Sequence, residues 1–207
     1  MYHELFADAT FWAFLFAIDQ DLARAARDKR CPSCGGRLHC ANYFRKPCGA
    51  RNLRDEYRQR LSFCCAGDGC RKRVTPPSVR FLGRKVYLGA VVILVSAMRQ
   101  GPSPRRVHEL TKLFGASRET IYRWREFWNE HFPRTTFWKL ARARLVPVFQ
   151  ITEFPRSLLE AFVRSEDDRD GWSKLLLFLA PISITNGLVI KVSEDSGKSA
   201  EDADRRS

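Results

Sequence analysis

The sequence predicts a mainly α-helical chain with a small β subdomain, an α+β fold class that includes a helix-turn-helix. Three observations predict this class. Apolar residues recur at helical spacing over several stretches, all seven cysteines fall within the turn-rich segment 30–82, and two short helical patterns are joined across one glycine. At 207 residues the chain has room for one medium domain or two small ones.

Residues 1–29 are predicted to form an N-terminal helical unit. Phe11, Leu15, Ile18 and Leu22 follow one another at spacings of four, three and four residues, which is typical of one apolar helix face. The charged stretch that ends at Arg30 closes the pattern. We therefore expect a helix over 9–28 that packs on a later part of the chain.

Residues 30–84 are predicted to form the small β subdomain, with short strands and two cysteine-bearing turns. Cys31 and Cys34 are two residues apart, and the proline and glycines around them favour a tight turn. Cys70 supplies one ligand of the second pair, and either Cys64 or Cys65 supplies the other. We favour Cys65, because it shares a strand face with Phe63, which would pack beneath the site.

Four cysteines at this spacing predict a zinc ribbon. The predicted ligands are Cys31, Cys34, Cys65 and Cys70, and four thiolates close a tetrahedral shell, so we expect one structural Zn²⁺ and no catalytic metal. The knuckle between Cys65 and Cys70 holds four residues instead of the usual two. His39, Cys40 and Cys48 lie between the pairs without a second close spacing, and we interpret the two cysteines as free thiols or surface residues.

Residues 85–132 are predicted to form a helical domain. A helix is expected over 85–98, a second over about 104–114, and a third from Ser117 to about His131. Residues 133–190 suggest further short helices. Residues 191–207 are polar, with no apolar residue larger than alanine after position 192, so we expect a disordered tail.

The second and third of these helices match a helix-turn-helix. Val107, Leu110 and Phe114 form one apolar stripe, Gly115 allows a sharp turn, and Ser117 can cap the helix that follows. The third helix turns Ile121, Trp124 and Trp128 inward. Its N-terminal half would then lie in a DNA major groove.

Charge favours a polyanionic partner. The formal net charge is +13 and the sequence pI is about 9.8, and no acidic residue occurs from position 69 to 108. This tract is a source of phosphate contacts, and the recognition helix can read base edges. The predicted DNA-binding residues are Arg71, Lys72, Arg73, Arg80, Arg84, Arg105, Arg106, Lys112, Ser117, Arg118, Glu119, Tyr122 and Arg123.

The apolar stretches favour a soluble, cytoplasmic protein. Glu4 and Asp8 stand where a signal peptide would carry positive charge. The runs 88–98 and 175–190 fall short of the roughly 18 continuous apolar residues that a membrane span needs. We expect no membrane partner.

The order of these features resembles the N-terminal region of bacterial insertion-sequence transposases. Three features carry the resemblance: the paired cysteines, the basic exit "VRFLGRK", and the "GASRETIYRW" turn and helix, all within about residues 30–131. It also looks like the short zinc-ribbon and helix-turn-helix protein that some insertion elements encode upstream of their catalytic frame. The resemblance implies binding to the ends of a mobile element and a nucleoid-associated location.

The expected function is sequence-specific binding of double-stranded DNA, without catalysis. The acids after His131 cluster in loops and short helices, unlike the three separated carboxylates of a transposase core, so no catalytic residue is assigned. A separate transposase catalytic subunit and a homodimer are possible partners. Two alternatives stay open: a host transcriptional regulator, and a zinc-ribbon adaptor for protein assembly that uses its apolar C-terminal segment.

Overall fold

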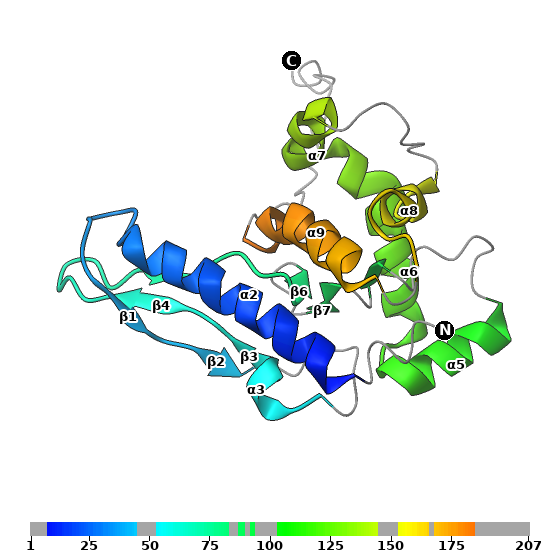
Figure 1. Ribbon diagram of the computed structural model, residues 1–207, viewed down its shortest axis with the longest axis horizontal. Helices are drawn as coiled ribbons and strands as arrows, with labels where there is room; N and C mark the ends of the chain where they lie inside the picture. The colour runs from blue at the N-terminus through cyan, green and yellow to red at the C-terminus, as the bar shows by residue number, and fades with distance from the viewer. Residues whose placement is uncertain are drawn as a thin grey trace, which may run out of the picture.

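A computed structural model describes residues 8–44, 53–82, 87–89, 92–93, 103–144, 153–165 and 168–184. Helices and small antiparallel sheets are mixed in one elongated molecule (Figure 1). A long helix lies over a narrow sheet at one end, and shorter helices gather at the other end. The predicted α+β class is confirmed at this level. The predicted tail over 191–207 lies outside the described residues.

Helix α2 (Ala9–Asp28) connects the two ends and confirms the helix expected over 9–28. Asp8 caps it by accepting hydrogen bonds from the backbone N–H and hydroxyl of Thr10, which satisfies N-terminal donors. Phe11, Trp12 and Leu15 join the large apolar core. Ala23, two turns later, joins a separate small core. One helix therefore belongs to both cores.

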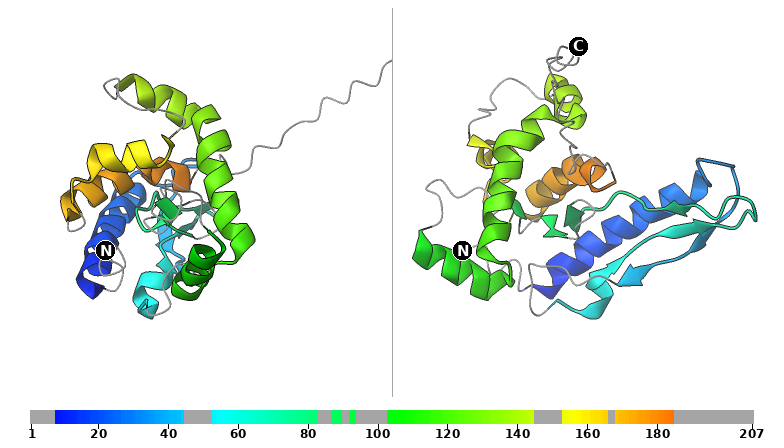
Figure 2. Two further views of the ribbon diagram at one scale, coloured as in Figure 1. Left: turned by 90° about the vertical axis from the view of Figure 1, so that its right-hand side faces the viewer. Right: turned by 180° about the vertical axis from the view of Figure 1, so that it is seen from behind.

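The small core lies under a three-stranded antiparallel sheet, which we call the cysteine sheet. Its strands are β1 (Leu38–Cys40), β4 (Phe63–Cys65) and β5 (Arg73–Val74), in the order β1-β4-β5. Leu38 pairs with Cys65, and Cys64 pairs with Arg73. Because side chains alternate along a strand, Phe63 and Cys65 face the core while Cys64 faces away. Figure 2 shows α2 running along this sheet.

Two smaller hairpins extend the sheet region. Strand β2 (Tyr43–Phe44) pairs with β3 (Gln59–Arg60), which directly follows the short helix α3 (Asp55–Arg58). Strand β6 (Phe81–Leu82) pairs with β7 (Tyr87–Leu88). This last hairpin crosses the domain boundary expected between residues 84 and 85.

The helix predicted over 85–98 is wrong at its start, because Tyr87 and Leu88 belong to strand β7. The N–H of Gly89 donates to the carbonyl of Arg80 at 2.8 Å, which extends the pairing. Cross-strand pairing with Phe81 and Leu82 has overridden the local helical periodicity. Val92 and Ile93 are helical and buried, and the remainder of this prediction falls on residues that are not described.

The helical end begins with the two helices predicted to flank Gly115. Helix α5 (Pro104–Phe114) and helix α6 (Arg118–Glu126) are joined by three residues, and Gly115 has φ +65°. Ser117 caps α6 by accepting from the N–H of Thr120. A π-helical segment η1 (Phe127–His131) continues α6, so the prediction of helix up to about His131 is confirmed.

Short helices complete this end and confirm the expectation for 133–190 where that segment is described. They are η2 (Phe132–Arg134), α7 (Thr136–Ala141), η3 (Arg142–Arg144), α8 (Arg156–Phe162), α9 (Arg169–Leu179) and η5 (Ala180–Ser183). Their shared core is aromatic. Phe132 lies 4.8 Å from the Trp128 ring and 5.3 Å from the Trp138 ring, centroid to centroid.

Helix α9 lies between α2 and the α6 region in Figure 1, with one face buried. Trp172, Leu175, Leu176 and Leu179 are all buried. The apolar C-terminal segment that suggested a protein partner is therefore largely used by the chain's own core. Within the described residues, no helix combines the length and apolar character needed to cross a bilayer.

Candidate metal centre and nucleic-acid interface

The first cysteine loop is held by its own backbone. The N–H of Cys31 donates to the carbonyl of Gly36 at 3.0 Å, and the N–H of Gly35 donates to the carbonyl of Cys31 at 2.8 Å. Gly35 has φ +69°, a conformation that glycine adopts without steric cost. A Cβ atom at Gly36 would lie 3.0 Å from the Cys65 sulfur. Both glycines are therefore needed for the cysteines to converge.

The second loop closes the wide knuckle between Cys65 and Cys70. The N–H of Cys70 donates to the carbonyl of Gly67 at 2.9 Å, and the N–H of Gly67 approaches the Cys65 sulfur at 3.4 Å. Gly67 thus turns the chain and also directs an N–H toward a ligand sulfur. The four intervening residues are accommodated in a compact turn.

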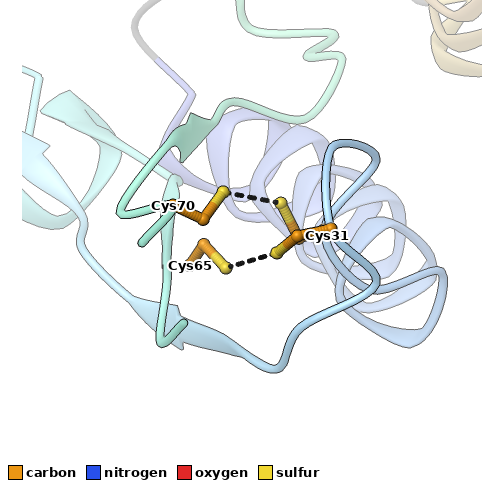
Figure 3. A group of neighbouring side chains, drawn as sticks. Cys31, Cys65 and Cys70 are labelled. Atoms are coloured by element: carbon orange, nitrogen blue, oxygen red, sulfur yellow. Dashed lines mark hydrogen bonds between the residues drawn. The ribbon is translucent and has the colours of Figure 1, made fainter. Parts of the chain in front are cut away.

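Four sulfurs meet between the two loops (Figure 3). The ligand atoms of Cys31, Cys34, Cys65 and Cys70 all lie within 4.8 Å of one another. Sγ of Cys31 is 3.7 Å from Sγ of Cys70, and Sγ of Cys34 is 3.3 Å from Sγ of Cys65. These distances exceed a disulfide bond of about 2.05 Å. The four thiols together can hold a metal ion.

The structure selects Cys65 over Cys64, as the strand argument predicted. Cys65 is 1% exposed and belongs to the sulfur cluster. Cys64 lies on the opposite strand face, and its sulfur donates to the carbonyl of Arg71 at 3.4 Å. His39 and Cys40 are exposed on β1, and Cys48 lies outside the described residues. Neither Cys64, His39 nor Cys40 belongs to the described cluster.

The surroundings of Cys31 favour its thiolate. A hydrogen bond from the backbone N–H of Ser33 is the main cause that lowers the pKa of the Cys31 thiol to about 6, and neighbouring thiols add to it. The pKa of Cys34 is raised instead: the Gly36 N–H acts to lower it, but the adjacent Cys65 thiol and burial outweigh this. The pKa values of the two thiols are thus shifted in opposite directions, and the backbone N–H of Ser33 favours the thiolate of Cys31.

Helix α6 presents the predicted base-reading residues on its exposed side. Thr120, Ile121 and Trp124 are buried, so the other arc of the helix faces solvent. That arc carries Arg118, Glu119, Tyr122 and Arg123, all of them exposed.

These exposed side chains are partly ordered by one another. The Arg118 guanidinium lies 5.5 Å from the centroid of the Tyr122 ring. Arg123 donates to the carbonyl of Glu119 at 3.3 Å and to the Thr120 hydroxyl at 3.1 Å. The pKa of Glu119 is lowered, first by its own backbone N–H and then by Ser117 and the two arginines. Glu119 is therefore a carboxylate at neutral pH.

The predicted phosphate contacts differ in their surroundings. Arg105 and Lys112 are exposed on α5, where Arg105 lies 3.5 Å from Glu109. Ser117 is engaged as the cap of α6. The side chains of Arg84 and Arg106 fall outside the described part of the chain.

The basic residues 71–73, which follow the second cysteine loop, are exposed, but some of them already make hydrogen bonds or ion pairs within the chain. Arg71 pairs with Asp68 at 2.9 Å, and Lys72 is exposed. Arg73 donates to the carbonyl of Ala41 at 2.8 Å and to the Ser62 hydroxyl at 2.6 Å. Arg73 therefore also holds the sheet together.

The prediction that Arg80 contacts DNA is wrong. Its side chain is 0% exposed, and its Nε donates to Asp19 at 2.8 Å. The two terminal nitrogens donate to the carbonyls of Tyr57 and Gln59 at 2.6 and 2.9 Å. A buried guanidinium is tolerated only when it is paired and hydrogen-bonded, and here the pairing leaves nothing to offer a phosphate.

Asp19 and Arg80 form the centre of a buried network that joins distant segments. Asp19 also accepts from the Ser78 hydroxyl at 2.6 Å and from the Val79 N–H at 2.7 Å. The Ser78 N–H donates to the Ser183 hydroxyl at 2.9 Å. Helix α2, the end of α3, the segment before β6 and the C-terminal η5 are thus connected. Nothing in the basic tract 69–108 indicates that Arg80, one of its arginines, is buried.

Sequence reasoning also missed a shallow hollow beside the first cysteine loop. It has a volume of about 400 Å³ and is lined by Arg27, Asp28, Arg30, Arg37 and Leu38. The arginines come from the end of a helix, a turn and the start of a strand. Only the closeness of Arg30 to Cys31 in the sequence could have pointed to it.

Comparison of the chain with protein-family models, curated proteins and solved structures gave no match.

Proposed function

We propose that this chain is a sequence-specific double-stranded DNA-binding protein whose cysteine sheet is ordered by one structural zinc ion. The observation that carries the proposal is the pair α5 and α6, joined at Gly115, with an exposed arc of Arg118, Glu119, Tyr122 and Arg123 at the start of the second helix. A helix-turn-helix places this part of its second helix in the major groove.

Zinc is the metal that suits four clustered thiols. Zinc bonds thiolate sulfur at about 2.3 Å, so a tetrahedral site separates its sulfurs by about 3.8 Å. The Cys31–Cys70 and Cys34–Cys65 separations of 3.7 and 3.3 Å need only small adjustment to reach that value. With four thiolates bound, no position is left for a substrate, and the ion's role is to hold the two loops together.

Base reading would fall to the arginines of α6. Arg118 and Arg123 can each pair with O6 and N7 of guanine, and the Glu119 carboxylate can accept from N4 of cytosine. Arg71, Lys72, Arg105 and Lys112 are exposed and can hold phosphates without reading sequence. The protein would act through binding and not through catalysis.

The association with a mobile element rests on the resemblance to insertion-sequence transposases. An accessory protein or a repressor at the element's ends fits the same binding chemistry, and a catalytic partner would be a separate subunit. A host transcriptional regulator would use the same residues. Inverted repeats flanking the gene would favour the mobile-element protein over the host regulator.

The first experiment combines metal analysis with selection of a binding site. Purified protein should contain about one zinc per chain and should enrich one sequence from a random duplex pool. Chelation should weaken binding to every duplex, because it unfolds the cysteine sheet and removes the phosphate contacts of that end. Uniform, salt-sensitive binding without enrichment would overturn sequence specificity and favour an adaptor that contacts nucleic acid nonspecifically.

Arg123→Ala tests the base-reading role on the selected duplex. We expect a loss of about 1–3 kcal/mol on the preferred sequence and little change on random duplex. Arg125→Ala, on the same helix but half-buried and outside the exposed arc, is the control. Arg71→Ala should weaken binding to all duplexes and flatten the salt dependence. An equal loss from Arg123→Ala on every sequence would contradict its assignment.

A further inference from the structure

We propose that the hollow lined by Arg27, Arg30 and Arg37 binds a backbone phosphate of the DNA duplex. The site lies beside the first cysteine loop and is separate from helix α6. The inference rests on the proposed DNA binding and deepens it, because it adds a contact surface at the cysteine end of the molecule.

Three arginine residues line the hollow, and hydrogen bonds hold the backbone of each. Arg27 lies in the last turn of α2, and its carbonyl accepts from the N–H of Arg30 at 3.0 Å. Arg37 directly precedes β1, and its carbonyl accepts from the N–H of Ala66 at 2.9 Å. The first cysteine loop consists of the six residues between Arg30 and Arg37. A metal ion that fixes the loop would therefore fix two of the three arginines.

In the part of the chain that the structure describes, these arginines have no acidic partner, and the same is true of Arg118 and Arg123 on α6. Several other arginines of the chain are paired. Arg24 pairs with Asp21 at 3.0 Å, Arg54 with Glu56 at 3.5 Å and Arg156 with Glu160 at 2.6 Å. Within the described ranges, no carboxylate lies within 4.0 Å of a guanidinium nitrogen of the three pocket arginines. Asp28 lines the hollow without pairing. The pocket thus carries a formal charge of +2, from three arginines and one aspartate.

The presence of an arginine at position 30 is a second observation that favours a binding role for the hollow. Arg30 has φ +60°, where a side chain is sterically unfavourable and glycine or asparagine is the usual helix-ending residue. The backbone conformation therefore does not explain an arginine. Arg71 also has a positive φ, of +46°, so the strain at Arg30 supports the proposal only together with the position of this residue in the lining of the hollow.

A simpler explanation is that these arginines only stabilise the C-terminal end of the α2 dipole. A cation in the last turn of a helix does stabilise the helix end, which accounts for Arg27. Arg30 and Arg37 lie beyond the helix, so this explanation does not reach them. The helix end contributes roughly half a negative charge, which the net charge of the pocket exceeds.

The chemistry of the pocket fits a phosphodiester. A planar guanidinium donates two parallel hydrogen bonds to phosphate oxygens, and three of them can surround one group. The buried Leu38 side chain gives the hollow an apolar floor. Because the whole chain has a charge of +13, a polyanion is favoured over a single small anion.

The test measures duplex affinity at several salt concentrations with the zinc-loaded full chain. We compare the triple variant Arg27→Gln/Arg30→Gln/Arg37→Gln with the control Arg24→Gln/Arg54→Gln/Arg156→Gln, which removes the same charge from paired arginines. The pocket variant should lose at least about tenfold more affinity than the control on every sequence. The slope of log K against log salt should also become smaller by about 0.9 for each phosphate that is no longer neutralised.

Arg30→Gly separates binding from folding. Glycine relieves the strained backbone, so the midpoint of thermal unfolding should stay the same or rise. Duplex affinity should nevertheless fall about threefold or more, because the variant cannot form a charge-assisted hydrogen bond to the phosphate. Affinity and stability that fall together would indicate a merely structural residue and would overturn the proposal.

The remaining outcomes distinguish this inference from the proposed function. If the native chain binds no duplex, the proposed function fails. Suppose instead that the native chain binds duplex and that Arg123→Ala changes its sequence preference. If the two triple variants then have equal affinity, the pocket inference fails while the proposed function stands. Calorimetric titration with inorganic phosphate tests a free anion: phosphate binding that disappears in the pocket variant, with unchanged duplex affinity, would overturn the backbone assignment.

Discussion

The cysteine sheet and the helical end share helix α2, but they bury very different amounts of apolar surface. Beneath the sheet the buried residues are Ala23, Cys31, Leu38, Leu61, Phe63 and Cys65. At the helical end all five tryptophans of the chain lie in one large aromatic core. A thin core must be supplemented by cross-links or metal, whereas a large one is stable through packing. The comparison indicates that the two ends respond to different perturbations.

Removing the metal should have the largest effect, and it should be confined to the cysteine end. Chelation of zinc-loaded protein, or Cys65→Ser, should unfold the cysteine sheet, because structural zinc contributes folding free energy of about 10 kcal/mol or more in small domains. Hydrogen exchange at the amides of β1 and β4 should become fast. Tryptophan fluorescence should change little, since all five tryptophans belong to the other core.

Cys64→Ser is the matched control for this prediction. Its sulfur lies outside the cluster, on the other strand face, so the variant should keep its zinc. A cooperative loss of tryptophan packing on chelation would show that the two cores fold as one unit.

Asp19→Ala should have the next largest effect and should reach both ends. It leaves Arg80 buried without its charge partner, which costs about 3–5 kcal/mol in comparable buried pairs. Urea unfolding with tryptophan fluorescence would measure the loss. The exposed pair of Asp21 with Arg24 provides the control Asp21→Ala, with an expected loss below about 1 kcal/mol. Equal losses would mean that the buried pair contributes no more to stability than the exposed pair.

Gly115→Ala should have the smallest of these effects, at the turn between α5 and α6. Space around Gly115 is open, but its φ of +65° is unfavourable for alanine, so we expect a loss of about 1–2 kcal/mol. Gly69→Ala is the control, because that site is equally open and has no positive φ. Thermal unfolding checks both variants. A neutral Gly115→Ala would show that the turn can relax.

Local sequence patterns predicted the structure correctly where one face of a helix or strand determines how that element packs. The periodicity of 9–28, the glycine at 115 and the serine at 117 placed α2, α5 and α6 correctly. The alternation of Phe63, Cys64 and Cys65 selected the right cysteine for the cluster. These features depend on neighbours within a few residues, and such neighbours can be read from the sequence.

Prediction failed where a distant partner decided the outcome. Tyr87 and Leu88 form a strand because Phe81 and Leu82 are there to pair with them. Arg80 is internal because Asp19, 61 residues away, meets it in the core. The unpaired state of Arg27, Arg30 and Arg37 also depends on which carboxylates the fold brings near.

The sequence by itself determined most of the helices, the four cysteines that cluster and the overall positive charge, because helical periodicity, close cysteine spacing and composition are local or additive properties. Only the tertiary structure decided which arginines are available to a phosphate. Every arginine carries the same charge along the chain. Whether that charge is neutralised by a carboxylate, buried in a network or left facing a hollow is set by contacts between segments far apart in sequence.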